Sequence, residues 1–183
     1  MARLFVAIDF PDKIKTALQQ CQPQLQAGLR NTQRDQLHLT LHFLGESSVD
    51  AVVAVVAALH SVPVDQFSLT IADVGRFETT DGGSILWAGL RPSVALTQLH
   101  QAISAALLPT GFNPETRPYS PHITLSRCAP GVPVDIIQTF LKAHAKLSLP
   151  PINVDQLSLY SSVLTPSGPE YKLETPDKMI DTK

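Results

Sequence analysis

Apolar residues recur along this chain in two rhythms, and the rhythm changes several times. Runs that alternate apolar and polar positions, or that are rich in β-branched residues, predict strands at 4–8, 37–44, 67–71, 85–90, 122–126, 157–159 and 171–173. Apolar residues spaced by three and four predict amphipathic helices at 11–27, 49–59, 93–108 and 133–141. Several consecutive strands are joined by turns, so the pattern predicts an α+β fold with largely antiparallel sheet, about seven or eight strands and four helices.

The length and the charge of the chain restrict its architecture and its partners. A chain of 183 residues can bury a full core, but it is short for two ordinary independent domains. We therefore expect one compact unit. The 14 Lys and Arg residues against 16 Asp and Glu residues give a formal net charge of −2, which argues against a protein that neutralises a long phosphate backbone. Any nucleic acid that it binds is expected to be contacted over a small piece only.

The cysteines and the apolar stretches indicate the compartment. Cys21 and Cys128 lie far apart and form no Cys-x-x-Cys motif, so they predict free thiols in a reducing environment. Asp9 and Pro11 interrupt the first apolar run before it reaches the length of a signal-peptide core. The longest apolar stretch, residues 49–59, is much shorter than the roughly 20 residues that span a bilayer. We expect a soluble, cytoplasmic protein that does not enter a membrane.

One short pattern occurs twice, once in each half of the chain. Residues His38 to Leu41 read His-Leu-Thr-Leu, and residues His122 to Leu125, which lie 84 positions later, read His-Ile-Thr-Leu. Each copy lies on a predicted strand, where residues two apart point to the same face. The His and the Thr of each copy therefore share one face, while the aliphatic residues can bury on the other. Strands of this kind hold polar groups in fixed geometry at the wall of a cleft.

Two histidines that face one phosphoryl centre can divide the work of an acid–base reaction. A neutral imidazole takes a proton from the attacking water or hydroxyl, and an imidazolium gives one to the leaving oxygen. The threonine hydroxyls beside them can donate hydrogen bonds to phosphoryl oxygens. This chemistry needs no metal and no cofactor. The sequence has no ligand cluster of metal-binding spacing, although a metal pair of His38 and His42 on one strand face stays open.

The chain resembles the RNA 2′,3′-cyclic phosphodiesterase family, also called 2′-5′ RNA ligase, of the two-histidine phosphoesterase superfamily. The similarity runs in order along nearly the whole chain, through the blocks Arg3–Asp9, Leu37–Gly45, Ile85–Leu90, Pro121–Arg127 and Leu157–Ser162. The resemblance implies a single domain over residues 1–183 with two pseudo-symmetric lobes. Each lobe would carry an antiparallel sheet and one motif, His38–Leu41 or His122–Leu125, beside a shared cleft. The family opens 2′,3′-cyclic phosphate at RNA 3′ ends to a 2′-phosphate, and it joins and cleaves 2′-5′ linkages without ATP.

Carried onto this chain residue by residue, the resemblance implies roles for five side chains. His38 becomes the proton donor to the departing 3′ oxygen, and His122 becomes the base that activates water. Thr40 and Thr124 become phosphate contacts, and Arg127 matches a substrate-contacting position. No metal and no cofactor is implied. The partners would be RNA 3′ ends with 2′,3′-cyclic phosphate, or 2′-5′-linked oligonucleotides, bound by a monomer.

The alternation of side chains along a strand raises a question about Arg127 and about His42. Arg127 comes five positions after His122, so it faces away from the cleft unless the strand ends or bulges near Ser126. By the same count His42 shares a face with His38, which makes it a peripheral substrate contact or a solvated residue. Surface or capping roles are favoured for the histidines on predicted helices, His60, His100 and His144.

The other candidates for substrate contact are given no role. Asn31 replaces the aromatic residue that relatives often carry in this region, which puts a role for its neighbour Arg30 in doubt. Aromatic side chains can stack on unstacked RNA bases, but core positions are the favoured interpretation of Phe5, Tyr119 and Tyr160.

Two other functions compete with RNA end hydrolysis. One is a related cyclic or 2′-5′ phosphodiesterase that acts on small nucleotides, and a comparison of rates on a mononucleotide and an oligomer would separate the two. The other is a noncatalytic RNA-end-binding protein, whose mark would be the loss of one motif histidine, and both are present. An ATP-dependent ligase is disfavoured because the chain has no Gly-rich P-loop and no Lys-x-Asp-Gly motif.

Overall fold

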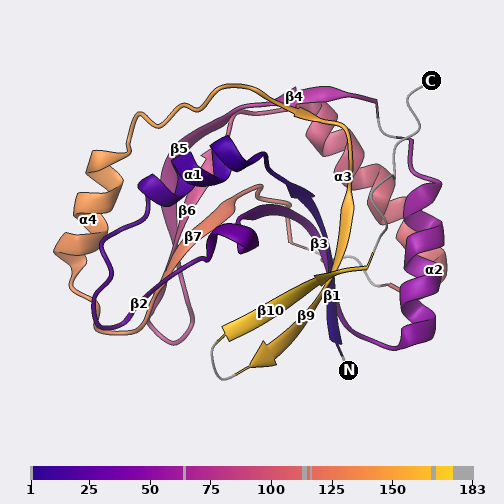
Figure 1. The fold of residues 1–183 in the computed structure, drawn as a ribbon, viewed down its shortest axis with the longest axis horizontal. Helices are drawn as coiled ribbons and strands as arrows, with labels where there is room; N and C mark the ends of the chain where they lie inside the picture. The colour runs from indigo at the N-terminus through magenta and orange to yellow at the C-terminus, as the bar shows by residue number, and fades with distance from the viewer. Residues whose placement is uncertain (1, 64, 113–114, 116, 166–167, 175–183) are drawn as a thin grey trace.

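The chain folds around two four-stranded antiparallel sheets that lie side by side, and a computed structural model describes residues 2–63, 65–112, 115, 117–165 and 168–174 (Figure 1). Sheet A has the strand order β10-β9-β1-β3, formed by Gly168–Leu173, Ser158–Thr165, Ala2–Asp9 and His38–Ser47. Sheet B has the order β2-β7-β6-β5, formed by Leu29–Asn31, Ile123–Cys128, Ser84–Leu90 and Ile71–Glu78. The predicted α+β class with antiparallel sheets is confirmed.

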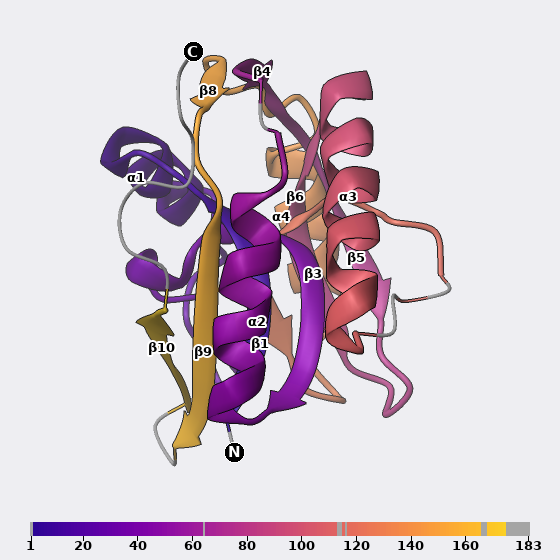
Figure 2. The same ribbon diagram turned by 90° about the vertical axis from the view of Figure 1, so that its right-hand side faces the viewer.

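Helices and short segments connect and cover the two sheets. The four α-helices are α1 (Asp12–Gln20), α2 (Val49–His60), α3 (Val94–Leu107) and α4 (Val134–Ala143). Two 3-10 turns, η1 (Arg34–Gln36) and η2 (Leu108–Thr110), precede β3 and follow α3. Helices α2 and α3 pack against each other, and Figure 2 shows them side by side. No helix of the described residues is both long and apolar enough to cross a membrane.

The two halves of the chain repeat one order of elements. The series β1-α1-β3-α2-β4-β5 is followed by β6-α3-β7-α4-β8-β9, apart from the short β2. The last strand of each series joins the sheet of the other half, because β5 pairs with β6 and β9 pairs with β1. The short strands β4 (Phe67–Leu69) and β8 (Ile152–Val154) pair with each other and tie the halves together. The motif strands β3 and β7 are in contact with each other.

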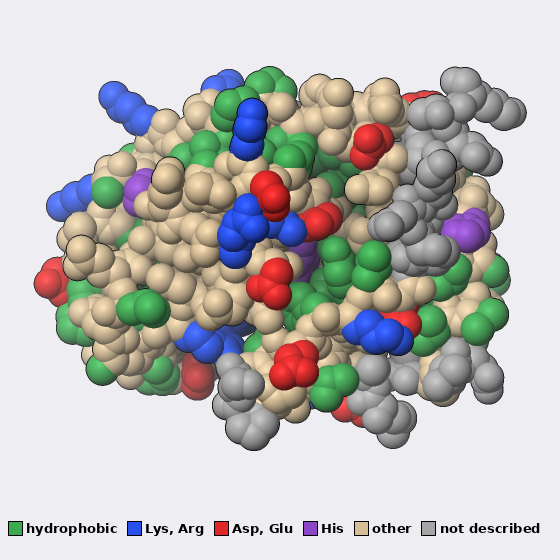
Figure 3. Space-filling model, in the orientation of Figure 1, with side chains coloured by type: hydrophobic (Ala, Val, Ile, Leu, Met, Phe, Trp, Pro, Cys, Tyr) green, Lys and Arg blue, Asp and Glu red, His purple; other side chains and the backbone are tan. Residues whose placement is uncertain are grey.

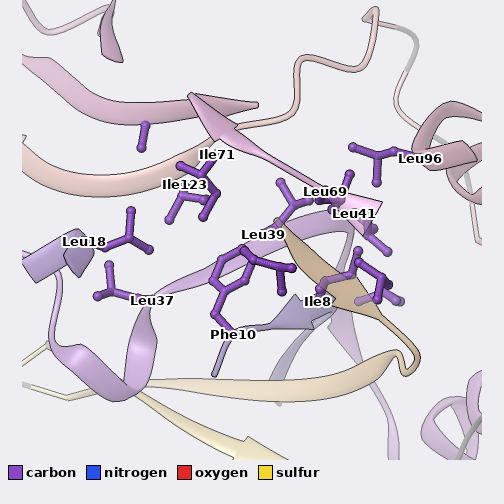
Figure 4. Packing of buried hydrophobic residues seen from close by; sticks show 14 of the residues in the cluster. Ile8, Phe10, Leu18, Leu37, Leu39, Leu41, Leu69, Ile71, Leu96 and Ile123 are labelled. Carbon is purple, nitrogen blue, oxygen red and sulfur yellow. The ribbon is translucent and has the colours of Figure 1, made fainter. Parts of the chain in front are cut away.

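The aliphatic residues of both motifs lie in one continuous core. Leu39 and Ile123, the second residue of each motif, are fully buried, and Figure 4 shows them among leucines and isoleucines from several elements. Burial of such a side chain contributes about 1.5–3 kcal/mol. Because these residues anchor one face of each strand, the His and Thr residues on the other face are held firmly.

Each motif strand contains a β-bulge at the same motif position. In β3, Thr40 pairs with Ala7 and His42 pairs with the preceding residue Val6, so Leu41 is the extra residue. In β7, the pairs Trp87–Thr124 and Leu86–Ser126 leave Leu125 as the extra residue in the same way. A bulge places two consecutive residues on one face and reverses the parity of all that follow. The burial pattern agrees with a bulge in each strand, because two consecutive residues are buried: Leu41 and His42 in β3, and Leu125 and Ser126 in β7.

A side chain from outside the strand contacts the bulge in each half. Gln22, just after α1, donates from Nε2 to the carbonyls of Leu125 at 3.0 Å and Thr32 at 2.7 Å. The Leu125 carbonyl also accepts from the backbone N–H of Thr32 at 2.9 Å, so two donors hold the bulged residue. In the other half, the ring of His100 in α3 stacks on the ring of His42, the residue after the extra Leu41, at 4.1 Å.

Several predicted boundaries are wrong for identifiable reasons. Helix α1 ends at Gln20 rather than at residue 27, because Pro23 disfavours helical backbone before it, and Leu25 is 72% exposed instead of buried. The predicted strand 67–71 is divided into β4 and the start of β5. Most of β5 was not predicted, because Asp73, with a φ of 63°, interrupts the alternation of apolar residues. The short strands β2 and β8 were not predicted either.

The bond from Gln22 to the β7 bulge leads to a stability prediction. Gln22→Ala leaves the Thr32 carbonyl without this donor, so the free energy of unfolding is expected to fall by about 1–2 kcal/mol. Urea unfolding measures the change, with Gln20→Ala, an exposed position on the same segment, as the matched control. Equal stability of the two variants would contradict a role for Gln22 in holding the bulge.

Candidate active site

A cleft of about 670 Å³ lies between the two sheets, and both motif strands line it. All five side chains singled out from the sequence border this cavity, namely His38, Thr40, His122, Thr124 and Arg127. The space-filling view in Figure 3 shows a hollow near the centre of one face with histidine surface inside it. The repeated motif thus brings residues 84 positions apart in the sequence to one cavity.

His38 is fixed by bonds to both ring nitrogens. Its Nδ1 lies 2.7 Å from the carbonyl oxygen of Gln36, which only accepts, so Nδ1 carries a proton and donates. Its Nε2 lies 3.0 Å from Oγ1 of Thr40, so in the neutral ring the threonine hydroxyl donates to Nε2. The ring stacks on Phe5 at 4.9 Å between centroids, and the edge of Tyr171 lies 5.5 Å away. The ring therefore has one orientation and one tautomer.

His122 is held in the corresponding way, with an open Nε2 side. Its Nδ1 donates to the carbonyl of Ser120 at 2.8 Å, and Ser120 precedes it by two residues just as Gln36 precedes His38. The edge of its ring meets Phe77 at 4.9 Å, and Trp87 lies 6.5 Å away. The backbone carbonyl two residues before each motif thus sets both rings with a basic Nε2, the tautomer that accepts a proton from water.

The two histidines differ in electrostatic environment. Burial lowers the pKa of His38 to about 4; Asp9 acts in the opposite sense, while Lys15 and the facing His122 lower it further. The influence of His122 indicates that the two imidazoles share one field across the cleft. His38 is therefore neutral at pH 7 in the free protein. An anion placed between the rings favours its charged form and raises this pKa.

The structure corrects the interpretation of His42. The bulge at Leu41 turns His42 away from the cleft, and its side chain is buried with 5% exposure. Its ring stacks on His100 at 4.1 Å, and its Nε2 lies 3.0 Å from the carbonyl of His100. A metal pair of His38 and His42 is thus ruled out by geometry, since the two rings lie on opposite faces. Among the described residues, no group of three or more His, Cys, Asp or Glu side chains could hold a metal ion.

One of the three helix histidines, His100, takes a different position from the one predicted. His100 is neither exposed nor a cap, because its ring lies between His42 and Tyr119, with the Tyr119 ring 4.0 Å away. The hydroxyl of Tyr119 donates to the carbonyl of Thr40 at 3.0 Å. This stack therefore joins the segment before the second motif to the first motif. His60 is exposed, and His144 is the C-cap residue of α4, as the sequence favoured.

The bulge at Leu125 resolves the parity of Arg127. With one residue extra, Arg127 returns to the face of His122 and Thr124, where it lines the cavity and is exposed. The corresponding residue of β3 is Phe43, which also lines the cavity and is 68% exposed. No sequence pattern marked either bulge.

Three aromatic residues pack together on the His38 side of the cleft, and two of them, Phe5 and Tyr171, border the cavity. Phe5 packs against Tyr160 at 5.3 Å and Tyr171 at 5.0 Å, besides its contact with His38. Phe5 is buried, as predicted for a core residue, yet it also borders the cavity. Tyr171 was not singled out from the sequence. The alternation of apolar and polar residues over 171–173 predicted only that Tyr171 lies on a strand.

Comparisons with known proteins agree on one family. Residues 10–164 match the 2′-5′ RNA ligase superfamily. The chain is 27% identical over 172 residues to the RNA 2′,3′-cyclic phosphodiesterase of Archaeoglobus fulgidus, covering 93% of this chain and 96% of that protein. It is 34% identical over 131 residues to the Escherichia coli protein of the same name, covering 69% and 72%. The crystal structure of Escherichia coli LigT complexed with 3′-AMP superimposes with a TM-score of 0.74 at 27% identity, covering 94% of both chains.

The environment of His38 leads to a prediction about its titration. In NMR spectra the ring of His38 is expected to titrate near pH 4 in the free protein, because burial disfavours the imidazolium. Inorganic phosphate in the cleft is expected to move this titration to higher pH, since a negative charge favours the charged ring. A titration that phosphate leaves in place would contradict an anion site between the two histidines. His60 in α2, which is exposed, serves as the internal control.

Proposed function

Because the chain belongs to the 2′-5′ RNA ligase superfamily, we propose that its cleft hydrolyses 2′,3′-cyclic phosphate at RNA 3′ ends to a 2′-phosphate. The chain is an RNA 2′,3′-cyclic phosphodiesterase. Its curated relatives carry this name, and the chain matches them over almost their whole length. One observation carries the proposal about mechanism. Two histidines from different sheets border one cavity, each with Nδ1 bonded to the carbonyl two residues earlier.

In the proposed reaction His122 is the base and His38 is the acid. Nε2 of His122 takes a proton from water as the water oxygen attacks phosphorus. The bond between phosphorus and O3′ breaks, and the proton on Nε2 of His38 passes to O3′. The product carries a 2′-phosphate and a free 3′-hydroxyl. His122 then returns its proton to solvent and His38 takes one up, which restores the starting state.

The hydrogen bonds of the free site fit these roles. The neutral tautomer held by Ser120 leaves Nε2 of His122 with a lone pair, as a base requires. His38 donates to Gln36 through Nδ1, so it can give a proton from Nε2 only as an imidazolium. The bound phosphate supplies the negative charge that raises its pKa. The hydroxyl of Thr40 then no longer donates to Nε2, and it turns with Thr124 toward the phosphoryl oxygens.

The same geometry favours a second activity, ATP-independent 2′-5′ joining. An RNA 5′-hydroxyl in place of water loses its proton to His122 and attacks the cyclic phosphate. O3′ leaves with the proton of His38, and the product is a 2′-5′ linkage. The energy comes from the strained cyclic ester, so no ATP is needed, and the superfamily name supports this activity.

The proposed substrate is a short RNA end rather than a duplex. The net charge of −2 offers little attraction to a long phosphate backbone. Both motifs of one chain border the same cavity, which supports a monomer as the working unit. Cys21 and Cys128 are buried free thiols, which suits a reducing cytoplasm.

The paired-histidine mechanism predicts the effect of two substitutions. His38→Ala and His122→Ala are each expected to lower kcat on a cyclic-phosphate oligoribonucleotide by about 10²–10⁴-fold, because each removes one proton-transfer partner. The wild-type rate is expected to persist in EDTA, since no step uses a metal. Near wild-type turnover of either variant would refute the paired roles. His60→Ala, at an exposed residue of α2, is the matched control.

A further inference from the structure

Two arginines from neighbouring strands face each other at the cleft. Arg30 of β2 pairs directly with Arg127 of β7 in the register of sheet B, and both side chains border the cavity. Like charges directly opposed across two strands are destabilising. Within the described part of the chain, neither guanidinium forms an ion pair with a carboxylate, and both side chains are exposed.

The two guanidinium groups gather beside the C-terminal hairpin of sheet A. A Cβ placed on Gly168, at the start of β10, would lie 3.7 Å from Nη1 of Arg30, and both residues line the cavity. Tyr171 of β10 lies in the field of both arginines and of Asp35. Burial raises the pKa of Tyr171, while Arg127 and Arg30 act in the opposite sense. The edge of the Tyr171 ring also packs against His38, so Tyr171 lies between the arginine pair and the motif histidine.

The position of the pair relative to the motif indicates what it binds. Because of the bulge, Arg127 is the next residue after Thr124 on the cleft face, which places it about 7 Å further along the strand. It therefore lies beyond a phosphate held by Thr124 and His122. Guanidinium groups present planar, bidentate donors that match phosphate oxygens.

From this geometry we infer that Arg30 and Arg127 form a second phosphate subsite, which holds the internucleotide phosphodiester adjacent to the cyclic end. This inference rests on the proposed function and adds a substrate requirement to it. An RNA of two or more nucleotides carries this phosphate, and a cyclic mononucleotide does not. The cleft therefore distinguishes RNA ends from small cyclic nucleotides by a charge one nucleoside away from the reaction.

Three substrates test the subsite. They are a cyclic mononucleotide, a dinucleotide with the same cyclic end, and the same dinucleotide with an uncharged methylphosphonate linkage. The wild-type kcat/KM is expected to be about tenfold or more higher for the charged dinucleotide than for the other two, as charge-assisted hydrogen bonds to one phosphate allow. Arg30→Gln is expected to bring the ratio of charged to uncharged dinucleotide close to one.

The controls separate the subsite from the fold and from the proposed function. Arg91→Gln removes one charge at an exposed position outside the cavity lining and is expected to keep the wild-type ratio. Equal losses on all three substrates in Arg30→Gln, or an unchanged ratio, would overturn the subsite. Absence of wild-type hydrolysis on every substrate would instead overturn the proposed function.

Discussion

The extra residue in each motif strand, Leu41 in β3 and Leu125 in β7, decides which side chains reach the cleft. Without it, the residue three positions after each threonine, Phe43 or Arg127, would point into the core. With it, Arg127 and Phe43 join the histidines at the cavity, and His42 packs against His100 instead. Side chains from outside the strands contact both bulges, Gln22 after α1 and His100 within α3. The site therefore depends on paired irregularities in otherwise regular sheets.

The same strand geometry also sets the chemistry of the two histidines. A backbone carbonyl two residues before each ring takes the Nδ1 proton, so both basic nitrogens point into the cleft. Burial lowers the pKa of His38, so this ring is neutral until an anion favours its charged form. Substrate binding and proton loading are thereby coupled, because the phosphate that reacts also favours the imidazolium.

Much of this arrangement is predictable from the sequence, and the rest has a physical reason for being hidden. Periodicity located the four helices and most strands, and the repeat of His-x-Thr-x located both histidines and both threonines, because these signals are local. The bulges are set by pairing with β1 and β6, so parity counted along one strand misplaced His42 and left Arg127 open. The positions of His100 and Tyr119 depend on packing of α3 against the first motif, which no local pattern records.

The structure suggests how a chain with a net charge of −2 can act on RNA. If, as we propose, the cleft holds the cyclic phosphate through two His-Thr pairs and one neighbouring phosphate through two arginines, no general basic excess is needed. If His38 protonates O3′ while His122 activates water, product analysis on a cyclic-phosphate oligoribonucleotide yields a 2′-phosphate with a free 3′-hydroxyl. A 3′-phosphate would refute this mechanism, because the proton would then have gone to O2′.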